Sequence, residues 1–200
     1  YHMTEGKPTL PGLPALRAEA GDRTMSLGID LEDLHSGLCL TLQYTVLEDY
    51  DVLTRSVRID NRGTDGVVLR RILSLLVDWP DNRYDVIHWS GAWAREREER
   101  RYSLGSGARW SIESRRGNSS HQEQPALWLT RPGAGLHEGE VWGVHLIYSG
   151  NFLGAVQEDE YGRCRLTLGI NPTGFGWHLE PGEHFQAPEA LMVYSDHGNH

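Results

Sequence analysis

The stretch LCLTLQYTVL, residues Leu38 to Leu47, carries the clearest signal of the fold class. Its apolar side chains alternate with small or polar ones over the first half, which places Leu38, Leu40, Leu42 and Tyr44 on one face of an extended strand. A helix would instead bring residues three or four positions apart onto one face. The stretch therefore predicts a β-strand with one face packed on a core.

The segment that follows continues the pattern. Leu53, Val57 and Ile59 face one way, and Arg55 is a charged interruption of that apolar face. The tripeptide Asn61-Arg62-Gly63 then supplies turn chemistry, because Gly and Asn tolerate positive φ. This predicts a second strand that ends in a tight turn.

Short apolar runs between turn residues recur along the chain. They predict strands at Val52–Asp60, Val67–Val77, Arg109–Ser114, Ala126–Thr130, Val141–Tyr148, Leu153–Gln157, Arg163–Ile170 and Ala190–Tyr194. The run Val67–Val77 is the most continuously apolar, so we expect one strand buried on both sides. The charged run Ala92–Arg101 is the single segment that we expect to be a surface helix. About nine short strands predict an all-β fold, a large antiparallel β-sandwich in one domain spanning residues 1–200.

Composition excludes several classes of partner. The formal charge of −9 argues against nucleic acid or an anionic membrane surface. No apolar run approaches the roughly 20 residues that cross a bilayer, and neither end resembles a signal peptide. The two cysteines, Cys39 and Cys164, are too few for a disulfide framework. We therefore expect two buried thiols in a reducing compartment, and a cytoplasmic protein.

The most polar run in the middle of the chain is SRRGNSSHQEQP, residues 114–125. It brings Ser119, Ser120, His121 and Glu123 within five positions. A nucleophilic serine needs a base within hydrogen-bond reach and a third group that orients the base. Adjacent residues of an extended loop point in different directions, and the chain contains no G-x-S-x-G motif. The run therefore argues weakly for a serine hydrolase.

Histidines and acidic residues give no metal motif. Neither His178 with His184 nor His121 with Glu123 has the spacing of a zinc or iron site. We expect no metal and no cofactor.

Tryptophan is unusually frequent, with seven residues against three phenylalanines. Carbohydrate sites use Trp because its flat face packs on sugar C–H groups while its N–H finds a partner. Burial between sheets is the more frequent role. Trp93, in SGAWARE beside Arg95 and Glu96, is the one that we expect at a polar site.

A glycoside hydrolase would need two carboxylates. The acidic cluster Glu158-Asp159-Glu160 is followed by Tyr161-Gly162, which is typical of a solvated hairpin turn. Glu189, after Pro188, is a better candidate for burial. Neither comes with an evident second carboxylate, so the residues alone assign no catalytic group to this chain.

Five blocks in a fixed order resemble one family. They resemble the amino-terminal β-supersandwich domain, galactose-mutarotase-like in fold, of the α-galactosidases of glycoside hydrolase family 36, the melibiases and raffinose-degrading enzymes. The blocks are RSVRIDNRG (55–63), SGAWARE (90–96), RRGNSSH (115–121), GEVWGVHLIYSGNF (139–152) and GINPTGFGWHLEPGEHFQAPE (169–189).

The resemblance implies where the chemistry lies. In these retaining enzymes a (β/α)₈ barrel follows the supersandwich and carries an aspartate nucleophile and an aspartate acid/base. The barrel's D-x-K-W-D block has no counterpart here, and the family's G-D-F-R-x-P-A segment normally lies just upstream of the position of Thr9-Leu10. We therefore expect the later two thirds of the amino-terminal domain of a longer protein, with no catalytic residue in this chain.

The resemblance also implies partners. They are the protein's own catalytic barrel, an α-galactoside such as melibiose or raffinose, and further copies in a homotetramer. As candidates for the substrate rim or barrel interface we select loop residues flanked by Gly, namely Trp93, Arg95, Ser119, Ser120 and His121. The alternative is that these residues only fix local turns.

Two other functions remain open at this point. The Trp excess fits a stand-alone carbohydrate-binding module. A sugar-active enzyme complete in 200 residues would instead need a carboxylate pair drawn from residues such as Glu96, Glu158 and Glu189.

Overall fold

The structure is a computed structural model that describes residues 1–199, and within them nearly all regular structure is β-strand. The strands are β1 (His2–Glu5), β2 (Thr24–Asp33), β3 (Leu38–Leu47), β4 (Val52–Asn61), β5 (Val67–Leu69), β6 (Leu73–Trp79), β7 (Asp85–Ala92), β8 (Arg95–Ser103), β9 (Arg109–Glu113), β10 (Glu123–Thr130), β11 (Val141–Ile147), β12 (Phe152–Glu158), β13 (Cys164–Ile170), β14 (Trp177–Leu179), β15 (His184–Gln186) and β16 (Glu189–Ser195). One 3₁₀ turn, Glu48–Tyr50, joins β3 to β4.

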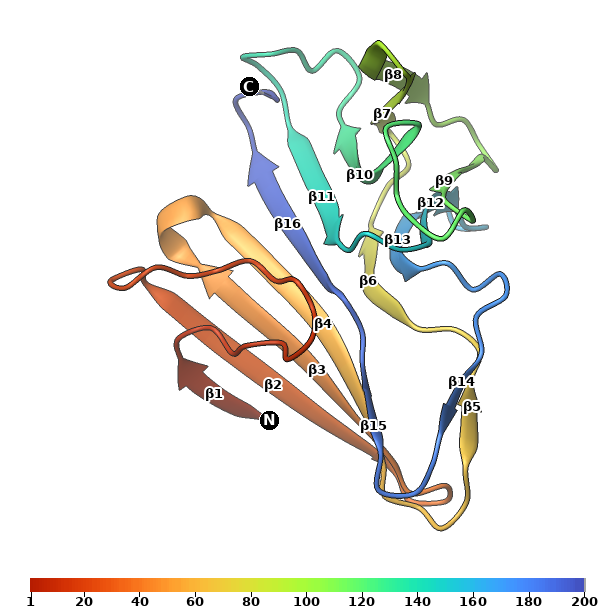
Figure 1. The fold of residues 1–200 in the computed structure, drawn as a ribbon. Helices are drawn as coiled ribbons and strands as arrows, with labels where there is room; N and C mark the ends of the chain where they lie inside the picture. Colours follow the sequence, from red (N-terminus) through yellow and green to blue (C-terminus); the bar gives the residue numbers. More distant parts are fainter. Residues whose placement is uncertain (200) are drawn as a thin grey trace.

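The strands form two layers and a ribbon. The larger sheet runs β1-β2-β3-β4-β16-β11-β10-β7-β8, with β15 pairing to β4. The smaller sheet runs β6-β13-β12-β9, and β14 with β5 forms a separate two-stranded ribbon. Figure 1 shows β1–β4 on one side of the molecule and the smaller sheet beside β10 and β11 on the other. All named pairs are antiparallel, which confirms the predicted all-β antiparallel sandwich.

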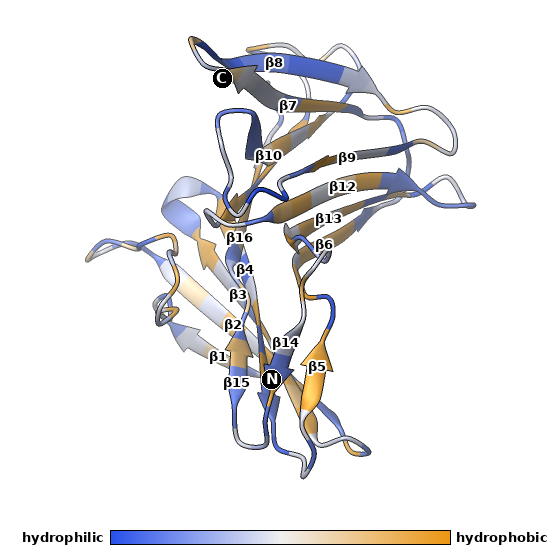
Figure 2. Cartoon of the chain, turned by 45° about the vertical axis from the view of Figure 1, so that its right-hand side comes forward, coloured by the Kyte–Doolittle hydropathy of each residue, from blue (hydrophilic) through white to orange (hydrophobic). Residues whose placement is uncertain are grey.

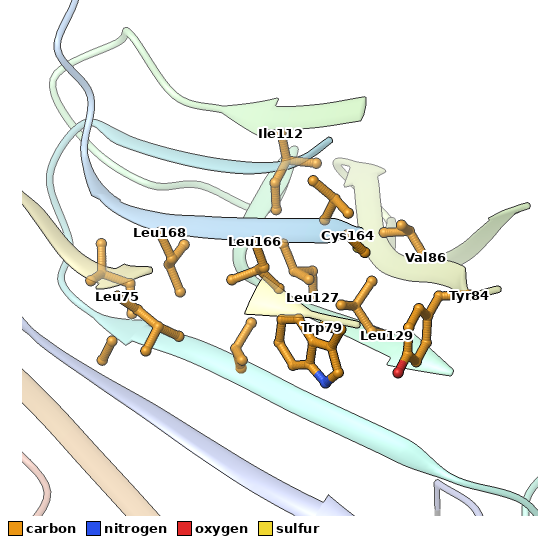
Figure 3. Close-up of a cluster of buried hydrophobic side chains, with 14 of the residues drawn as sticks. Leu75, Trp79, Tyr84, Val86, Ile112, Leu127, Leu129, Cys164, Leu166 and Leu168 are labelled. Carbon is orange, nitrogen blue, oxygen red and sulfur yellow. The ribbon is translucent and has the colours of Figure 1, made fainter. Parts of the chain in front are cut away.

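The main core lies where β10, β11 and β16 face the smaller sheet. Leu127 and Leu129 on β10 meet Leu166 and Leu168 on β13, and all four are fully buried (Figure 3). A second cluster beside β4 gathers Val57 and Ile59 with residues of β14, β15 and the loops around them. Burying these apolar side chains supplies the main favourable term in folding.

The strands predicted at 38–47 and 52–60 are confirmed. The leucines of the expected apolar face of β3 pack against the second cluster. Arg55 is satisfied on that face because its guanidinium donates to the Ser74 carbonyl oxygen at 2.7 Å and to the Tyr44 hydroxyl at 3.1 Å. A charge on an apolar face is tolerated when its donors are paired in this way.

The helix predicted at Ala92–Arg101 is wrong, because this segment forms the β7–β8 hairpin. Trp93 and Ala94 make the two-residue turn, and Ala94 adopts φ 62°. The charged residues of β8 favour a helix by propensity, but pairing with β7 overrides it. Figure 2 shows β8 as largely hydrophilic, as suits an edge strand that must not recruit another sheet.

The single buried strand predicted at Val67–Val77 is also wrong. The chain divides there into β5, which pairs with β14, and β6, which pairs with β13. Arg70 and Arg71 lie in the irregular link between them. Val67 and Leu69 pack on the second cluster while Leu75 enters the main core, so one apolar run serves two separate clusters.

The number of strands and the state of the two cysteines were also predicted from the sequence. Sixteen strands lie in the described residues, against about nine expected, because short strands such as β14 and β15 carry little sequence signal. Cys39 and Cys164 are both buried free thiols, as predicted. No helix in residues 1–199 is long and apolar enough to cross a membrane.

One apolar face stays partly open. Met25, Leu31 and Val46 alternate onto the same side of the β2–β3 pair and are 38%, 49% and 43% exposed. No described segment covers these three side chains fully.

Candidate functional site: a rim surface built by the β7–β8 turn and the loop before β10

Two segments far apart in sequence meet at one end of the larger sheet. We call them together the rim surface, defined as residues 91–95 and 114–123. It contains all five residues selected from the sequence. Trp93 stands at the tip of the β7–β8 turn with 86% of its surface exposed, and Arg95, which pairs with Ala92, is exposed beside it.

Gly91 is the point where the two segments cross. Its N–H donates to the carbonyl oxygen of Gln122 at 3.3 Å. A Cβ at this position would lie 2.7 Å from the Arg95 carbonyl oxygen, 2.9 Å from Glu96 Cα and 3.1 Å from the His121 carbonyl oxygen. The glycine of SGAWARE is therefore needed for close approach of backbones rather than for flexibility.

The loop at 114–122 is held by its neighbours. The Asn171 side-chain amide donates to the Ser114 carbonyl oxygen at 3.2 Å and fixes its beginning. The Gly117 N–H donates to Asn151 Oδ1 at 2.6 Å, and the Ser119 N–H donates to the Ser149 carbonyl oxygen at 2.7 Å. The loop is thus positioned by hydrogen bonds to the β11–β12 turn, which satisfy part of its irregular backbone.

The serines and the histidine of this loop do not form a catalytic pair. The Ser120 hydroxyl accepts a hydrogen bond from the Gln122 N–H at 3.2 Å, as in a local turn. Within residues 1–199 no hydrogen bond joins the His121 ring to either serine hydroxyl. Neither serine therefore has, among the described residues, the oriented base that a nucleophile needs.

A groove of about 300 Å³ runs along the loop. Its lining carries both charges and neutral hydrogen-bonding groups: Glu113, Ser114, Arg115, Arg116, Ser120, Gln122 and Glu123. Of the five selected residues, only Ser120 is among this lining. Ser119, His121, Trp93 and Arg95 lie on the same surface without lining the groove.

The two carboxyls of the groove differ in their electrostatics. Burial works to raise the pKa of Glu113, but hydrogen bonds from Asn171 and Arg115 outweigh it and hold the pKa below its usual value. Burial raises the pKa of Glu123. Such divergence is typical of acid and base pairs in glycosidases, yet Glu113 here is already neutralised by Arg115.

Behind Glu123 lies a buried histidine. His88 Nδ1 is 3.5 Å from Glu123 Oε2, and neither atom has a hydrogen-bond partner among the described residues. Burial, reinforced by the positive charge of Arg100, lowers the pKa of His88. The His88 ring packs on Tyr102 and Trp110, so the aromatic cluster fixes its position.

The three carboxylates considered above as catalytic candidates, Glu96, Glu158 and Glu189, each bind a neighbouring group of the domain. Glu189 is buried, as predicted, and binds Lys7 Nζ at 2.6 Å. Glu158 accepts from Asn82 at 2.6 Å, and Glu96 accepts from the Ala94 N–H at 3.0 Å. They come from β16, β12 and β8, three separate parts of the fold.

The turn predicted at 158–162 is confirmed between β12 and β13. The Asp159 carboxylate accepts from the N–H groups of Tyr161 and Arg163 at 2.9 and 3.0 Å. Within residues 1–199 no group of three His, Cys, Asp or Glu side chains could hold a metal ion.

Sequence comparison adds the family. The model of the glycosyl hydrolase family 36 N-terminal domain matches residues 1–180. The chain belongs to this family. As a family 36 domain it is 48% identical over 198 residues to the α-galactosidase AgaA of Geobacillus stearothermophilus, which covers 99% of the chain. It is 38% identical over 200 residues to α-galactosidase C of Emericella nidulans.

Solved structures agree with the family 36 fold. The crystal structure of AgaA superposes with a TM-score of 0.95 at 47% identity, over 98% of this chain. A crystal structure of an AgaA variant, also at a TM-score of 0.95, is in complex with raffinose. The chain spans only 27% of the length of AgaA and 26% of that of the Emericella protein.

Sequence reasoning missed three features of this domain. Glu113 gave no signal because it ends an ordinary strand, and His88 gave none because single histidines in apolar runs are frequent. Trp177, 48% exposed on β14, was overlooked among seven tryptophans. Pairing of β7 with β10 brings His88 to Glu123, 35 positions away, and only the fold could reveal that contact.

Proposed function

We propose that this chain is the non-catalytic part of a longer retaining α-galactosidase that hydrolyses terminal α-galactosides of the melibiose and raffinose type. The observation that carries the proposal is the match to AgaA along 99% of this chain but only 27% of that α-galactosidase. Residues 1–200 would form one β-supersandwich domain, with the catalytic barrel contributed by the rest of the protein.

The rim surface is the part of the domain that we assign to the barrel and the substrate pocket. Its support is structural: Trp93 is a large apolar side chain with 86% exposure at a turn whose backbone is held by Gly91 and the neighbouring loop. Exposed aromatic groups on rigid turns are typical of interfaces. Arg95, Ser119, Ser120 and His121 would contact the barrel around Trp93, and the full-length protein would assemble as a homotetramer.

We also propose a cytoplasmic location. Its support is the pair of buried free thiols, Cys39 and Cys164, which suits a reducing compartment. Burial raises the pKa of the Cys164 thiol to about 12, so this side chain stays unreactive.

The substrate is tested with the full-length protein. Purified enzyme is expected to release galactose from raffinose, melibiose and an aryl α-galactoside. A full-length protein that carries both barrel aspartates but releases no galactose from any of the three would overturn the proposal.

The rim assignment is tested by Trp93→Ala in the full-length protein. We expect lower activity or a smaller assembly, with the thermal stability of the isolated chain unchanged, because Trp93 contacts little within it. Tyr161→Ala is the matched control, since Tyr161 is 75% exposed on a turn outside the rim surface. Equal, wild-type behaviour of both variants would remove the rim assignment.

A further inference from the structure

A second groove, of about 340 Å³, shares no lining residue with the groove of the rim surface. We call it the aromatic groove. It lies between the N-terminal loop and the β14–β15 region, and its lining includes Leu13, Tyr148, Trp177, His184, Phe185 and Gln186.

The floor of this groove is a fixed aromatic surface. Trp177 packs edge-on against Phe185, with ring centroids 5.1 Å apart and planes at 62°. Phe185 in turn packs on Phe175 at 5.9 Å. Trp177 also pairs through its backbone with Leu69 of β5, yet its side chain remains 48% exposed. The indole is therefore held in place while one face stays available.

The opposite wall is anchored by a buried ion pair. Lys7 Nζ lies 2.6 Å from Glu189 Oε1, with side-chain exposures of 5% and 4%. The second oxygen of Glu189 accepts from the Leu16 N–H at 2.7 Å. These contacts hold the loop that carries Leu13, so both walls are formed before any ligand arrives, which lowers the entropic cost of binding.

Three residues with polar side chains line the aromatic groove. The Gln186 amide donates to the carbonyl oxygens of Val57 and Ala187 at 3.2 and 3.1 Å, which leaves its Oε1 as a preset acceptor. His184 and Tyr148 are also among the lining residues.

The charge of the lining selects the class of ligand. None of the described residues that line the aromatic groove is Asp, Glu, Lys or Arg, so a charged ligand would lose its hydration without an opposite charge in return. An aromatic face bordered by a few donors and acceptors suits a ring with an apolar face and hydroxyl edges. We propose that the aromatic groove binds a neutral saccharide, with the C–H face of one pyranose ring against Trp177 and its hydroxyls on Gln186 and His184.

The proposal rests on the lining of the groove and not on the activity of the parent enzyme. The test uses the 200-residue chain, titrated with methyl α-galactoside, raffinose and methyl α-glucoside by calorimetry and by ¹H–¹⁵N NMR of the indole signals. We expect millimolar binding of at least one saccharide and a shift of the Trp177 indole signal, identified by its loss in Trp177→Phe.

Substitutions distinguish binding in the aromatic groove from non-specific binding elsewhere on the chain. Trp177→Ala should weaken binding about tenfold or more, as expected for a lost aromatic contact. His184→Ala tests the polar edge without touching the aromatic packing and should also weaken binding. Tyr161→Ala is the control, because Tyr161 is a 75% exposed aromatic side chain that lies outside both the aromatic groove and the rim surface.

Three results would overturn the proposal. One is the absence of any Trp177 shift with all three saccharides. Another is an equal shift with cyclohexane-methanol, which would make the groove a general apolar surface. The third is protection of Trp177 in the full-length protein: N-bromosuccinimide would oxidise Trp177 in the isolated chain but not in the longer protein. The groove would then be covered by another part of the same protein.

Discussion

The buried ion pair between Lys7 and Glu189 offers the sharpest test of how the N-terminal loop is held. The two charges are 2.6 Å apart with side-chain exposures of 5% and 4%, and Glu189 also accepts the Leu16 N–H. Removing one partner of a buried pair leaves the other charge desolvated and costs about 3–5 kcal/mol. Lys7→Met and Glu189→Gln should therefore each destabilise the chain by about that amount, which corresponds to a fall in Tm of roughly 6–20 °C for this length.

The double variant carries the decisive information. With both Lys7→Met and Glu189→Gln no charge stays buried, and the glutamine still offers an acceptor to Leu16. The free energy of unfolding of the double variant should recover most of what each single variant loses, because replacing a buried ion pair by uncharged side chains often changes stability little. A double-mutant cycle then yields a coupling energy of about 3 kcal/mol or more.

Urea unfolding followed by circular dichroism measures all four proteins, with the slope of each transition checked for constancy. The exposed pair Arg165–Asp78, at 2.7 Å, is the matched control and should show little coupling because water and salt screen it. Hydrogen exchange at the Leu16 amide should accelerate in Lys7→Met. Single variants that each cost less than about 1 kcal/mol and add without coupling would refute the reasoning.

Three further predictions address the rim surface, the buried histidine and the open apolar face. Gly91→Ala should destabilise the chain by about 1–3 kcal/mol in urea unfolding, because the new Cβ would lie 2.7 and 2.9 Å from atoms of β8. Gly105→Ala is its control, since a Cβ at Gly105 would have no atom within 4 Å beyond its chain neighbours, and an equal loss of stability in both variants would contradict the account. Burial lowers the pKa of His88, so the unfolded chain takes up the proton first and stability should fall as the pH drops from about 7.5 to about 5.5. His88→Gln, with Glu123 left in place, should flatten this dependence of stability on pH. The raised pKa of Glu123 acts in the opposite direction at the lower end of the pH range. An unchanged pH dependence in His88→Gln would show that His88 does not control it. The isolated chain should self-associate in sedimentation velocity through the face that carries Val46, and Val46→Lys should shift it toward monomer, whereas a wild-type chain that stays monomeric at high concentration would rule this face out.

The sequence was most informative where one local rule decided the outcome. Alternation in LCLTLQYTVL sufficed for β3, because the period of two is a direct consequence of strand geometry. The turn after β12 was predicted from Tyr161-Gly162 behind the acidic cluster, and in the structure the Asp159 carboxylate accepts a hydrogen bond from the Tyr161 N–H there. The five ordered blocks pointed to the family that the comparisons then identified.

The sequence failed where tertiary pairing overrode a local preference. The charges of β8 predicted a helix, but the close crossing at Gly91 and the turn at Trp93–Ala94 fold it onto β7. The run from Val67 to Val77 is divided between the β5–β14 ribbon and the smaller sheet for the same reason.

The candidate site was predictable only in part. The two segments of the rim surface were selected from their polar and aromatic residues, and the structure places them side by side. The contact of His88 with Glu123 and the half-exposed Trp177 depend on strand register and packing, which no short window of sequence contains.

The central claim is that this domain supports catalysis by a longer enzyme without cleaving the substrate itself. The most direct test is the hydrolysis of an aryl α-galactoside by the purified 200-residue chain, measured beside the full-length protein. We predict no turnover by the chain alone and clear turnover by the full-length enzyme. Turnover that co-purifies with the chain and disappears in Glu113→Gln or Glu123→Gln would contradict the claim and place a catalytic pair in the groove of the rim surface.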